Sequence, residues 1–75
     1  METKQNSMKN LIKVERARHN MSQQDLADRL GITRQSVHAI EAGKFVPSTV
    51  LALKMARLFD LKVEDIFMLE EKDIN

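Results

Sequence analysis

The feature that most constrains this 75-residue chain is a glycine set between two short stretches of helical pattern. In LADRLGITRQSVHAIEAGK, residues 26–44, leucines recur at helical spacing before Gly31, and Val37 and Ile40 continue the spacing after it. A glycine inside a helix costs about 1 kcal/mol relative to alanine. The pattern therefore predicts two short helices joined by a tight turn, with Gly31 in the left-handed conformation that ends the first helix.

Polar residues mark where each of these helices begins. Ser22-Gln23-Gln24-Asp25 has the form of a capping box, in which the Ser22 hydroxyl accepts from the Asp25 amide and the Asp25 carboxylate reaches back. Thr33 is a typical N-cap for the next helix, and Gly43 ends that helix. The helices expected from these signals cover residues 23–30 and 34–42.

Two short helices joined by a turn that contains glycine are typical of the helix-turn-helix motif. Val37 and Ile40 are expected to hold the second helix against the core. The opposite face of that helix then points outward near its N-terminal end, and it carries Arg34, Gln35 and His38.

The rest of the chain also carries helical patterns. Leu11 and Val14 belong to an apolar spacing of about 3.5 residues that predicts a first helix over residues 9–19. The expected fourth helix begins after a Ser48 cap, and a short fifth helix is expected over residues 63–67. The apolar residues of the fourth helix lie one turn apart, at Leu51, Met55 and Phe59. The predicted fold class is all-α with five helices.

Three successive apolar residues follow at Phe67, Met68 and Leu69. This segment is too apolar for a free tail, so either it packs on the core or it forms a strand and contacts a partner chain. A core this small is marginal unless a partner extends it. We therefore expect a dimer contact in this segment.

Composition limits the classes of protein to which the chain can belong. It has no cysteine, and no apolar run approaches the ~20 residues of a membrane span. Its first residues, METKQNS, lack an apolar signal-peptide core, so we expect a cytoplasmic protein. Residues 1–44 carry eight Lys or Arg and five Asp or Glu, whereas residues 45–75 carry four and six. This asymmetry suits a basic face turned toward an anion.

The span from Ile12 to Phe67 resembles the DNA-binding domain of phage Cro and lambda-type repressors, the xenobiotic-response-element family. Two stretches carry the resemblance, MSQQDLADRLGITRQSVHAIEAGK and PSTVLALKMARLFDLKVEDIF, and the combined pattern SQxxLAxxLGxxRQxxxxIExGK is highly specific. The tail VEDIFMLEE is similar to very short single-domain members, some of which pair an N-terminal strand with a C-terminal one. The resemblance implies a five-helix, lambda-repressor-like fold, with a short terminal β ribbon as an alternative.

The resemblance also implies roles for individual side chains. Arg34 and Gln35 match the main base-reading positions, where arginine suits guanine and glutamine suits adenine. His38 lies one turn further along the same face. Gln23 resembles a glutamine that meets the DNA backbone and braces the reading helix. The positions that resemble contacts to the DNA backbone are Gln23, Thr33, Ser36 and Lys44.

Other matched positions concern structure, and two depart from the family pattern. Arg16 and Glu41 resemble a buried ion pair that ties the first helix to the third. Glu15 stands where the family often has an aliphatic residue. Ala42 stands where a longer polar residue often contacts phosphate, so one backbone contact is expected to be missing.

We therefore expect a DNA-binding transcriptional regulator that acts as a homodimeric repressor. Two alternatives remain, an antitoxin that also binds a toxin and a protein-interaction module on the same fold. The sequence shows no nucleophile–base pair, phosphate-cradling glycine loop or metal-ligand cluster, so we expect no enzyme activity, cofactor or metal. The expected domain organisation is a flexible N-terminus at residues 1–8, the DNA-binding domain with its dimerisation segment at 9–69 and a polar tail at 70–75.

Overall fold

The computed structural model describes residues 8–70, and this span holds five helices and a two-stranded ribbon. The elements in chain order are β1 (Lys9–Asn10), α1 (Ile12–Arg18), α2 (Gln23–Leu30), α3 (Arg34–Glu41), α4 (Thr49–Phe59), α5 (Val63–Ile66) and β2 (Phe67–Met68). The five expected helices are confirmed, and the alternative with a terminal ribbon is the correct one. The expected flexible N-terminus and polar tail lie outside the described residues, apart from Met8 and Glu70.

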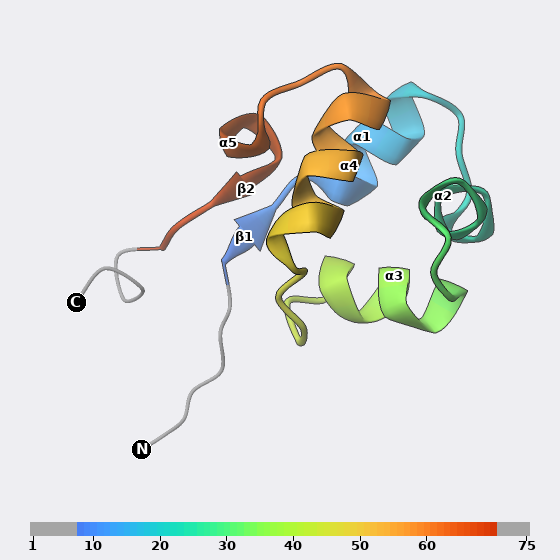
Figure 1. The fold of residues 1–75 in the computed structure, drawn as a ribbon, viewed down its shortest axis with the longest axis horizontal. Coiled ribbons are helices and arrows are strands. Elements are labelled where there is room, and N and C mark those ends of the chain that lie inside the picture. The colour runs from blue at the N-terminus through green and yellow to red at the C-terminus, as the bar shows by residue number, and fades with distance from the viewer. Residues whose placement is uncertain (1–7, 71–75) are drawn as a thin grey trace.

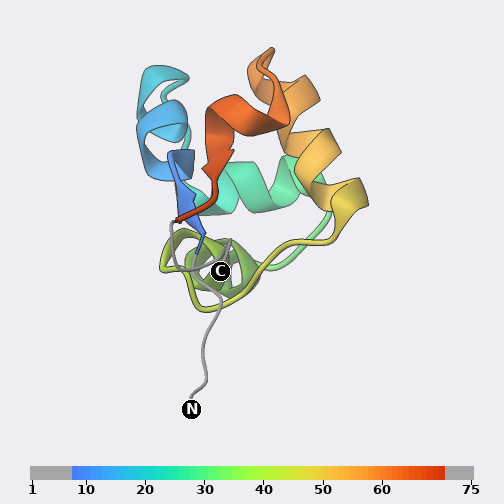
Figure 2. The same ribbon diagram turned by 90° about the vertical axis from the view of Figure 1, so that its left-hand side faces the viewer.

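The helices enclose a single core, with the ribbon and α5 at one end of the molecule and α2 at the other (Figure 1). In the view turned by 90° (Figure 2), α3 again lies along the lower edge, below the other helices. Its position at this edge leaves one side of α3 open to solvent, while its other side faces the core.

The turn between α2 and α3 forms as its local signals predict. The Ser22 hydroxyl accepts from the Asp25 amide at 3.0 Å, and the Asp25 carboxylate accepts from the Ser22 amide at 2.9 Å. Gly31 ends α2 with a φ of 74°, in the left-handed region that a side chain would disfavour. Thr33 then caps α3 by accepting from the Ser36 amide at 3.1 Å. These contacts are all local, which is why the sequence alone places both helices to within a residue.

The first helix differs from the expectation at its start and in its buried face. It begins at Ile12, because Lys9 and Asn10 form a strand. Leu11 and Val14, expected on the apolar stripe, are 38% and 45% exposed, whereas Ile12 is fully buried. The two possible apolar faces are offset by one residue. The face that is buried includes Glu15, a charged residue of a type that is usually exposed.

The ribbon joins the two ends of the described chain. β1 pairs with β2 in antiparallel fashion, with Lys9 opposite Met68 and Asn10 opposite Phe67. The Leu11 amide also donates to the Ile66 carbonyl at 2.8 Å. Helix α5 therefore ends at Ile66, one residue earlier than expected, because Phe67 takes the extended conformation of β2. Phe67 also packs into the core, so this segment both forms a strand and packs on the core of its own chain, while the expected contact with a partner chain stays a prediction.

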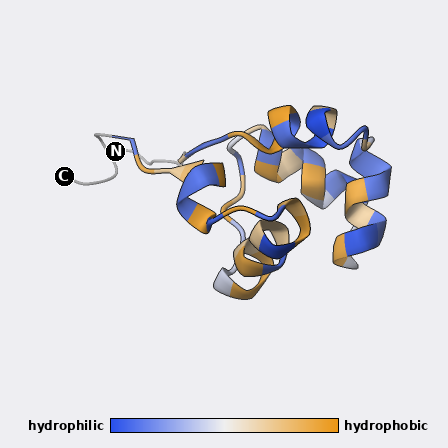
Figure 3. Ribbon diagram, turned by 90° about the horizontal axis from the view of Figure 1, so that it is seen from above, coloured by the Kyte–Doolittle hydropathy of each residue, from blue (hydrophilic) through white to orange (hydrophobic). Residues whose placement is uncertain are grey.

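The core combines residues from every helix with one from the ribbon. Hydrophobic and hydrophilic residues alternate around the helices (Figure 3), as expected for short helices that bury one face each. The buried apolar residues are Ile12, Leu26, Ala27, Leu30, Val37, Ile40, Met55, Ala56, Phe59, Ile66 and Phe67. No helix within residues 8–70 has the length and apolar character needed to cross a bilayer.

Candidate nucleic-acid interface

Helix α3 presents one face to the core and another to solvent. Val37 and Ile40 are buried, whereas Arg34, Gln35 and His38 are exposed. Residues three and four positions apart share a helix face, so the three exposed side chains lie on one strip. The structure thus brings the predicted base-reading residues together on one accessible surface, and their contact with bases stays a prediction.

The hydroxyl groups at the start of α3 are partly engaged within the protein. The Thr33 hydroxyl oxygen accepts from the Ser36 amide and lies 2.9 Å from the Ser36 hydroxyl oxygen. Each hydroxyl has one proton to donate, and the bond between the two uses one of them. One proton remains for an outward bond, so the pair can give at most one hydroxyl donor to a phosphate.

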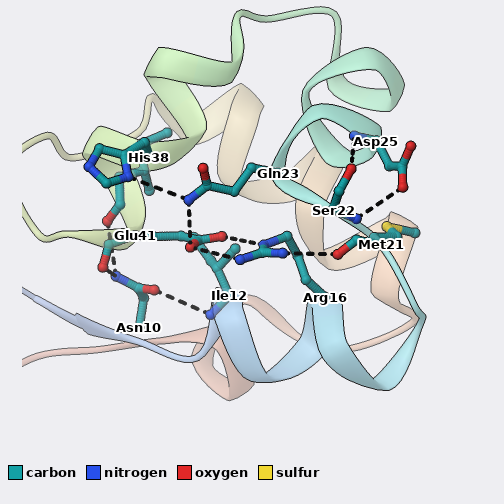
Figure 4. Close-up of polar contacts among 10 residues, drawn as sticks. Asn10, Ile12, Arg16, Met21, Ser22, Gln23, Asp25, His38 and Glu41 are labelled. Atoms are coloured by element: carbon teal, nitrogen blue, oxygen red, sulfur yellow. Dashed lines mark hydrogen bonds and ion pairs between the residues drawn. The ribbon is translucent and has the colours of Figure 1, made fainter.

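Gln23 lies at the start of α2 and reaches across to α3 (Figure 4). Its Nε2 donates to Glu41 Oε1 at 3.2 Å and lies 3.5 Å from His38 Nδ1. Gln23 therefore braces the third helix, as the resemblance implies. Since its amide hydrogens face α3, the groups left for DNA are its Oε1 and its main-chain amide, and a helix N-terminus is suited to phosphate.

Arg16 and Glu41 meet between α1 and the end of α3 (Figure 4). Arg16 Nε lies 2.5 Å from Glu41 Oε2, and Arg16 Nη2 donates to Oε1 at 3.2 Å. Arg16 Nη1 also donates to the carbonyl of Met21 at 2.9 Å, between α1 and α2. The hydrogen bond to Glu41 raises the pKa of Arg16, so the guanidinium stays charged. Because the Glu41 side chain is only 8% exposed, the pair is largely shielded from water.

Lys44 follows directly on the residue that ends the third helix. Gly43 has a φ of 76°, which turns the chain away from the helix axis and leaves Lys44 exposed. Ala42, the C-cap residue of α3, is exposed and has only a methyl group to offer. The expected loss of a backbone contact at this position is consistent with that geometry, while the phosphate contact of Lys44 stays a prediction.

Two residues that the motifs do not single out lie beside these groups. Asn10 Nδ2 donates to the Ile40 and Glu41 carbonyls at 3.0 and 3.4 Å. Lys13 is exposed on α1 and lines a shallow pocket of about 390 Å³ together with Gln23 and His38. Both belong to α1 or the strand before it, so only tertiary packing brings them next to α3 and local patterns give no signal.

The other histidine, His19, makes its contacts within the protein and lies outside the exposed strip of α3. His19 Nδ1 lies 2.9 Å from the Glu15 carbonyl oxygen, and its ring centroid is 5.3 Å from that of Phe59. Among residues 8–70, no group of three or more His, Cys, Asp or Glu side chains is placed to hold a metal ion.

The chain is similar to known helix-turn-helix proteins. A helix-turn-helix family profile matches residues 12–66. The chain is 52% identical over 66 residues to an uncharacterized HTH-type transcriptional regulator of Methanocaldococcus jannaschii, an alignment that covers 88% of this chain and 100% of that protein. It is also 52% identical over 66 residues to the uncharacterized HTH-type transcriptional regulator YgzD of Bacillus subtilis, with the same coverage.

The chain also has the fold of a solved structure. The chain is similar to a crystal structure described as that of a candidate DNA-binding protein from Bacteroides fragilis, with a TM-score of 0.72 and 25% sequence identity. The superposition covers 80% of this chain and 97% of that one.

Proposed function

The chain belongs to the helix-turn-helix family of Cro/C1-type transcriptional regulators, and from this premise we propose that it represses transcription by binding a specific DNA site as a homodimer. The observation that carries the proposal is the exposed strip of α3, where Arg34, Gln35 and His38 stand on a helix whose opposite face is buried. A helix held in this way can enter the major groove with its N-terminal residues against base edges.

Each side chain of the strip suits a different part of a base pair. The guanidinium of Arg34 can donate two hydrogen bonds to O6 and N7 of guanine, and the amide of Gln35 can pair with N6 and N7 of adenine. His38 extends the strip by one turn toward the C-terminal end of α3. Gln23 of α2 lies beside His38 and donates to Glu41. These contacts within the protein hold the part of the strip that is next to α2.

Contacts to the DNA backbone then set the register of the helix without reading sequence. The start of α2 at Gln23 offers free amides, the Thr33–Ser36 pair offers one hydroxyl donor, and Lys44 offers a charge. We add Lys13 to this set, because it lines the same shallow pocket as Gln23 and His38. Its charge supplies a phosphate contact on the α1 side of the interface.

We propose that two copies associate through an apolar hollow formed by α4, the loop before it and the C-terminal segment. Val46, Leu53 and Leu69 line this hollow of about 330 Å³, and they are 42%, 56% and 62% exposed. Exposed apolar groups that cluster around one depression are typical of protein contacts. A second copy is the partner that fits, because paired subunits can occupy two half-sites one helical turn, about 34 Å, apart.

Repression requires no further domain, since a dimer bound over a promoter blocks it by occupancy. A chain with this role acts in the cytoplasm, where its DNA lies. Fragments of the source genome that the protein retains identify the operator, and fluorescence anisotropy with that duplex at several salt concentrations then tests the proposal. We expect affinity to fall by orders of magnitude between about 50 and about 200 mM salt. A flat salt response with no preference for the selected duplex would contradict DNA recognition by this face.

A further inference from the structure

Asn10 joins three separate elements through one side chain (Figure 4). It lies in β1, opposite Phe67 of β2. Its Nδ2 donates to the carbonyls of Ile40 and Glu41, the last two residues of α3, at 3.0 and 3.4 Å. Its Oδ1 accepts from the amide of Ile12, the first residue of α1, at 3.2 Å.

Both ends of this carboxamide meet main-chain groups at helix ends. The last four carbonyls of a helix and its first four amides have no main-chain hydrogen-bond partner within the helix. The Ile40 carbonyl also accepts from the Gly43 amide at 3.0 Å, so the Asn10 amide adds a second donor at the end of α3, while the Asn10 oxygen supplies an acceptor at the start of α1. Asparagine carries both on one short side chain, whereas an ionised aspartate carries acceptors only. The chemistry at this position thus favours an amide.

The two ends of α3 are held in different ways. At its start, the left-handed Gly31 and the Thr33 cap connect it to α2 by a tight turn. At its end, the seven residues 42–48 lead to α4, so the chain itself restrains this end less. The polar side chains that hold it there are Asn10, which bonds the last carbonyls of α3, and Arg16 and Gln23, which both bond the Glu41 carboxylate.

We propose that Asn10 is a positioning residue for α3, which fixes the angle at which the helix meets DNA and so contributes to sequence specificity. This inference rests on the proposed function, because it assumes that α3 reads bases. Without the Asn10 amide, α3 can tilt about its start, and His38 moves further than Arg34 because it lies further from the pivot. Contacts to bases depend on such shifts, whereas contacts to phosphates mainly set affinity for any sequence.

Two variants separate the roles of the carboxamide. Asn10→Asp keeps an acceptor for the Ile12 amide and places a carboxylate against the α3 carbonyls, which accept hydrogen bonds and repel it. Asn10→Ser is uncharged and keeps a short acceptor, but its hydroxyl is too short to reproduce the amide bond to α3. As a matched control, Leu58→Ala removes a partly buried side chain from the α4 part of the core.

The test measures affinity by anisotropy for the selected operator and for a random duplex, with folding checked by circular dichroism. Wild-type preference for the operator tests the proposed function by itself. For both Asn10 variants we expect the operator-to-random affinity ratio to fall about tenfold, equivalent to 1.4 kcal/mol, with random-duplex affinity nearly unchanged. Leu58→Ala is expected to lose stability and keep the wild-type ratio.

Several results overturn the inference while leaving the proposed function intact. One is a wild-type ratio in a folded Asn10 variant, and another is an equal loss of affinity for both duplexes. If Asn10→Asp does not fold, Asn10→Ser decides the question. Loss of folding in both variants assigns Asn10 a purely structural role and also overturns the inference.

Discussion

Arg16 and Glu41 form a two-point contact between the first helix and the end of the third, with Nε–Oε2 and Nη2–Oε1 distances of 2.5 and 3.2 Å. The same carboxylate accepts from Gln23 of α2, so one buried group receives donors from two helices. Together with Asn10 at the adjacent carbonyls, these contacts set how α3 lies against the rest of the protein. The candidate DNA surface is thus supported by a polar network behind it.

The first prediction concerns the stability of this pair. Arg16→Ala or Glu41→Ala alone leaves a shielded charge without its partner and is expected to lower the free energy of unfolding by about 3–5 kcal/mol. The double variant Arg16→Met with Glu41→Leu is expected to lose much less, because no charge is left unpaired. Urea unfolding of the three variants measures these differences. A double variant as unstable as the sum of the two singles would show that the residues do not act as a pair.

The second prediction concerns Glu15, which is 5% exposed on the core-facing side of α1. Its Oε2 lies 3.6 Å from Nη1 of Arg18, whose side chain is 69% exposed. An ion pair in which one partner is exposed to solvent stabilises the fold only slightly, whereas burying the carboxylate destabilises it. Glu15→Leu is therefore expected to raise the free energy of unfolding by about 1 kcal/mol or more, as such replacements often do.

Urea unfolding also measures this gain, and DNA affinity provides its control because Glu15 lies outside the proposed interface. Arg18→Ala is expected to lower stability slightly in the wild-type chain and not at all in the Glu15→Leu background. A clear loss of stability in Glu15→Leu would mean that the carboxylate is better satisfied in the fold than its 3.6 Å contact indicates.

The third prediction is a pH dependence at the start of α2. Hydrogen bonds from the Ser22 amide and then from its hydroxyl hold the pKa of Asp25 below its ordinary value of 3.8. A carboxyl group whose pKa is lower in the folded state stabilises the fold above its unfolded pKa, and this contribution is lost as the pH falls through the folded pKa. Asp25→Asn is therefore expected to have a lower melting temperature near neutral pH and a difference that closes below pH 3.8.

Thermal unfolding followed by circular dichroism across this range measures the effect. Asp28→Asn is a suitable comparison on the same helix, because Asp28 lies outside the capping box and accepts from Gln24. A melting-temperature difference for Asp25→Asn that stays constant from neutral to acid pH would argue against an ionised cap.

Local signals explain which parts of the fold the sequence predicts. The box at Ser22 and Asp25, the left-handed Gly31 and the Thr33 cap each involve residues within a few positions, so α2 and α3 are predictable from the chain alone. The outward placement of Arg34 follows from the same periodicity.

Long-range contacts explain the errors and the omissions. Leu11 and Ile12 offer two apolar stripes for α1, and pairing with the C-terminal segment at Ile66 selects the stripe that buries Glu15. Each strand of the ribbon has only two residues, so neither strand carries a recognisable alternation. Asn10 meets α3 thirty residues away, and no spacing rule connects them.

The fourth prediction separates the residues of the C-terminal segment. Phe67 is 8% exposed and belongs to the protomer's own core, whereas Leu69 is 62% exposed at the edge of the apolar hollow. Truncation before Phe67 would therefore damage the fold itself, so a point substitution is the better test of association. Leu69→Glu is expected to weaken the dimer while the protomer stays folded, because it places a charge in an apolar contact.

Sedimentation velocity over a range of protein concentrations measures the association. Val50→Glu is a matched control, since Val50 is 68% exposed on α4 and does not line the hollow. If Leu69→Glu remains dimeric with wild-type affinity, the two copies meet elsewhere and this hollow is not their contact.

The last prediction distinguishes Arg34 from Lys44, two exposed cations at opposite ends of the third helix. Arg34 stands at the first position of α3, where its planar guanidinium can meet a guanine edge, whereas Lys44 follows Gly43 and is expected to meet phosphate alone. Arg34→Ala is expected to cost about 1–3 kcal/mol on the operator and much less on random DNA. Lys44→Ala is expected to weaken binding to the operator and to random DNA by similar factors. It is also expected to reduce the magnitude of the slope of log K against log salt by about 1 per subunit.

Anisotropy titrations with both duplexes at several salt concentrations resolve the two roles. Arg34→Lys is the informative control, because it keeps the charge and loses the planar pair of donors. It is expected to bind random DNA like the wild type and the operator less tightly. If Arg34→Ala lowers affinity for both duplexes equally, Arg34 contacts phosphate, and base reading then rests on Gln35 and His38 alone.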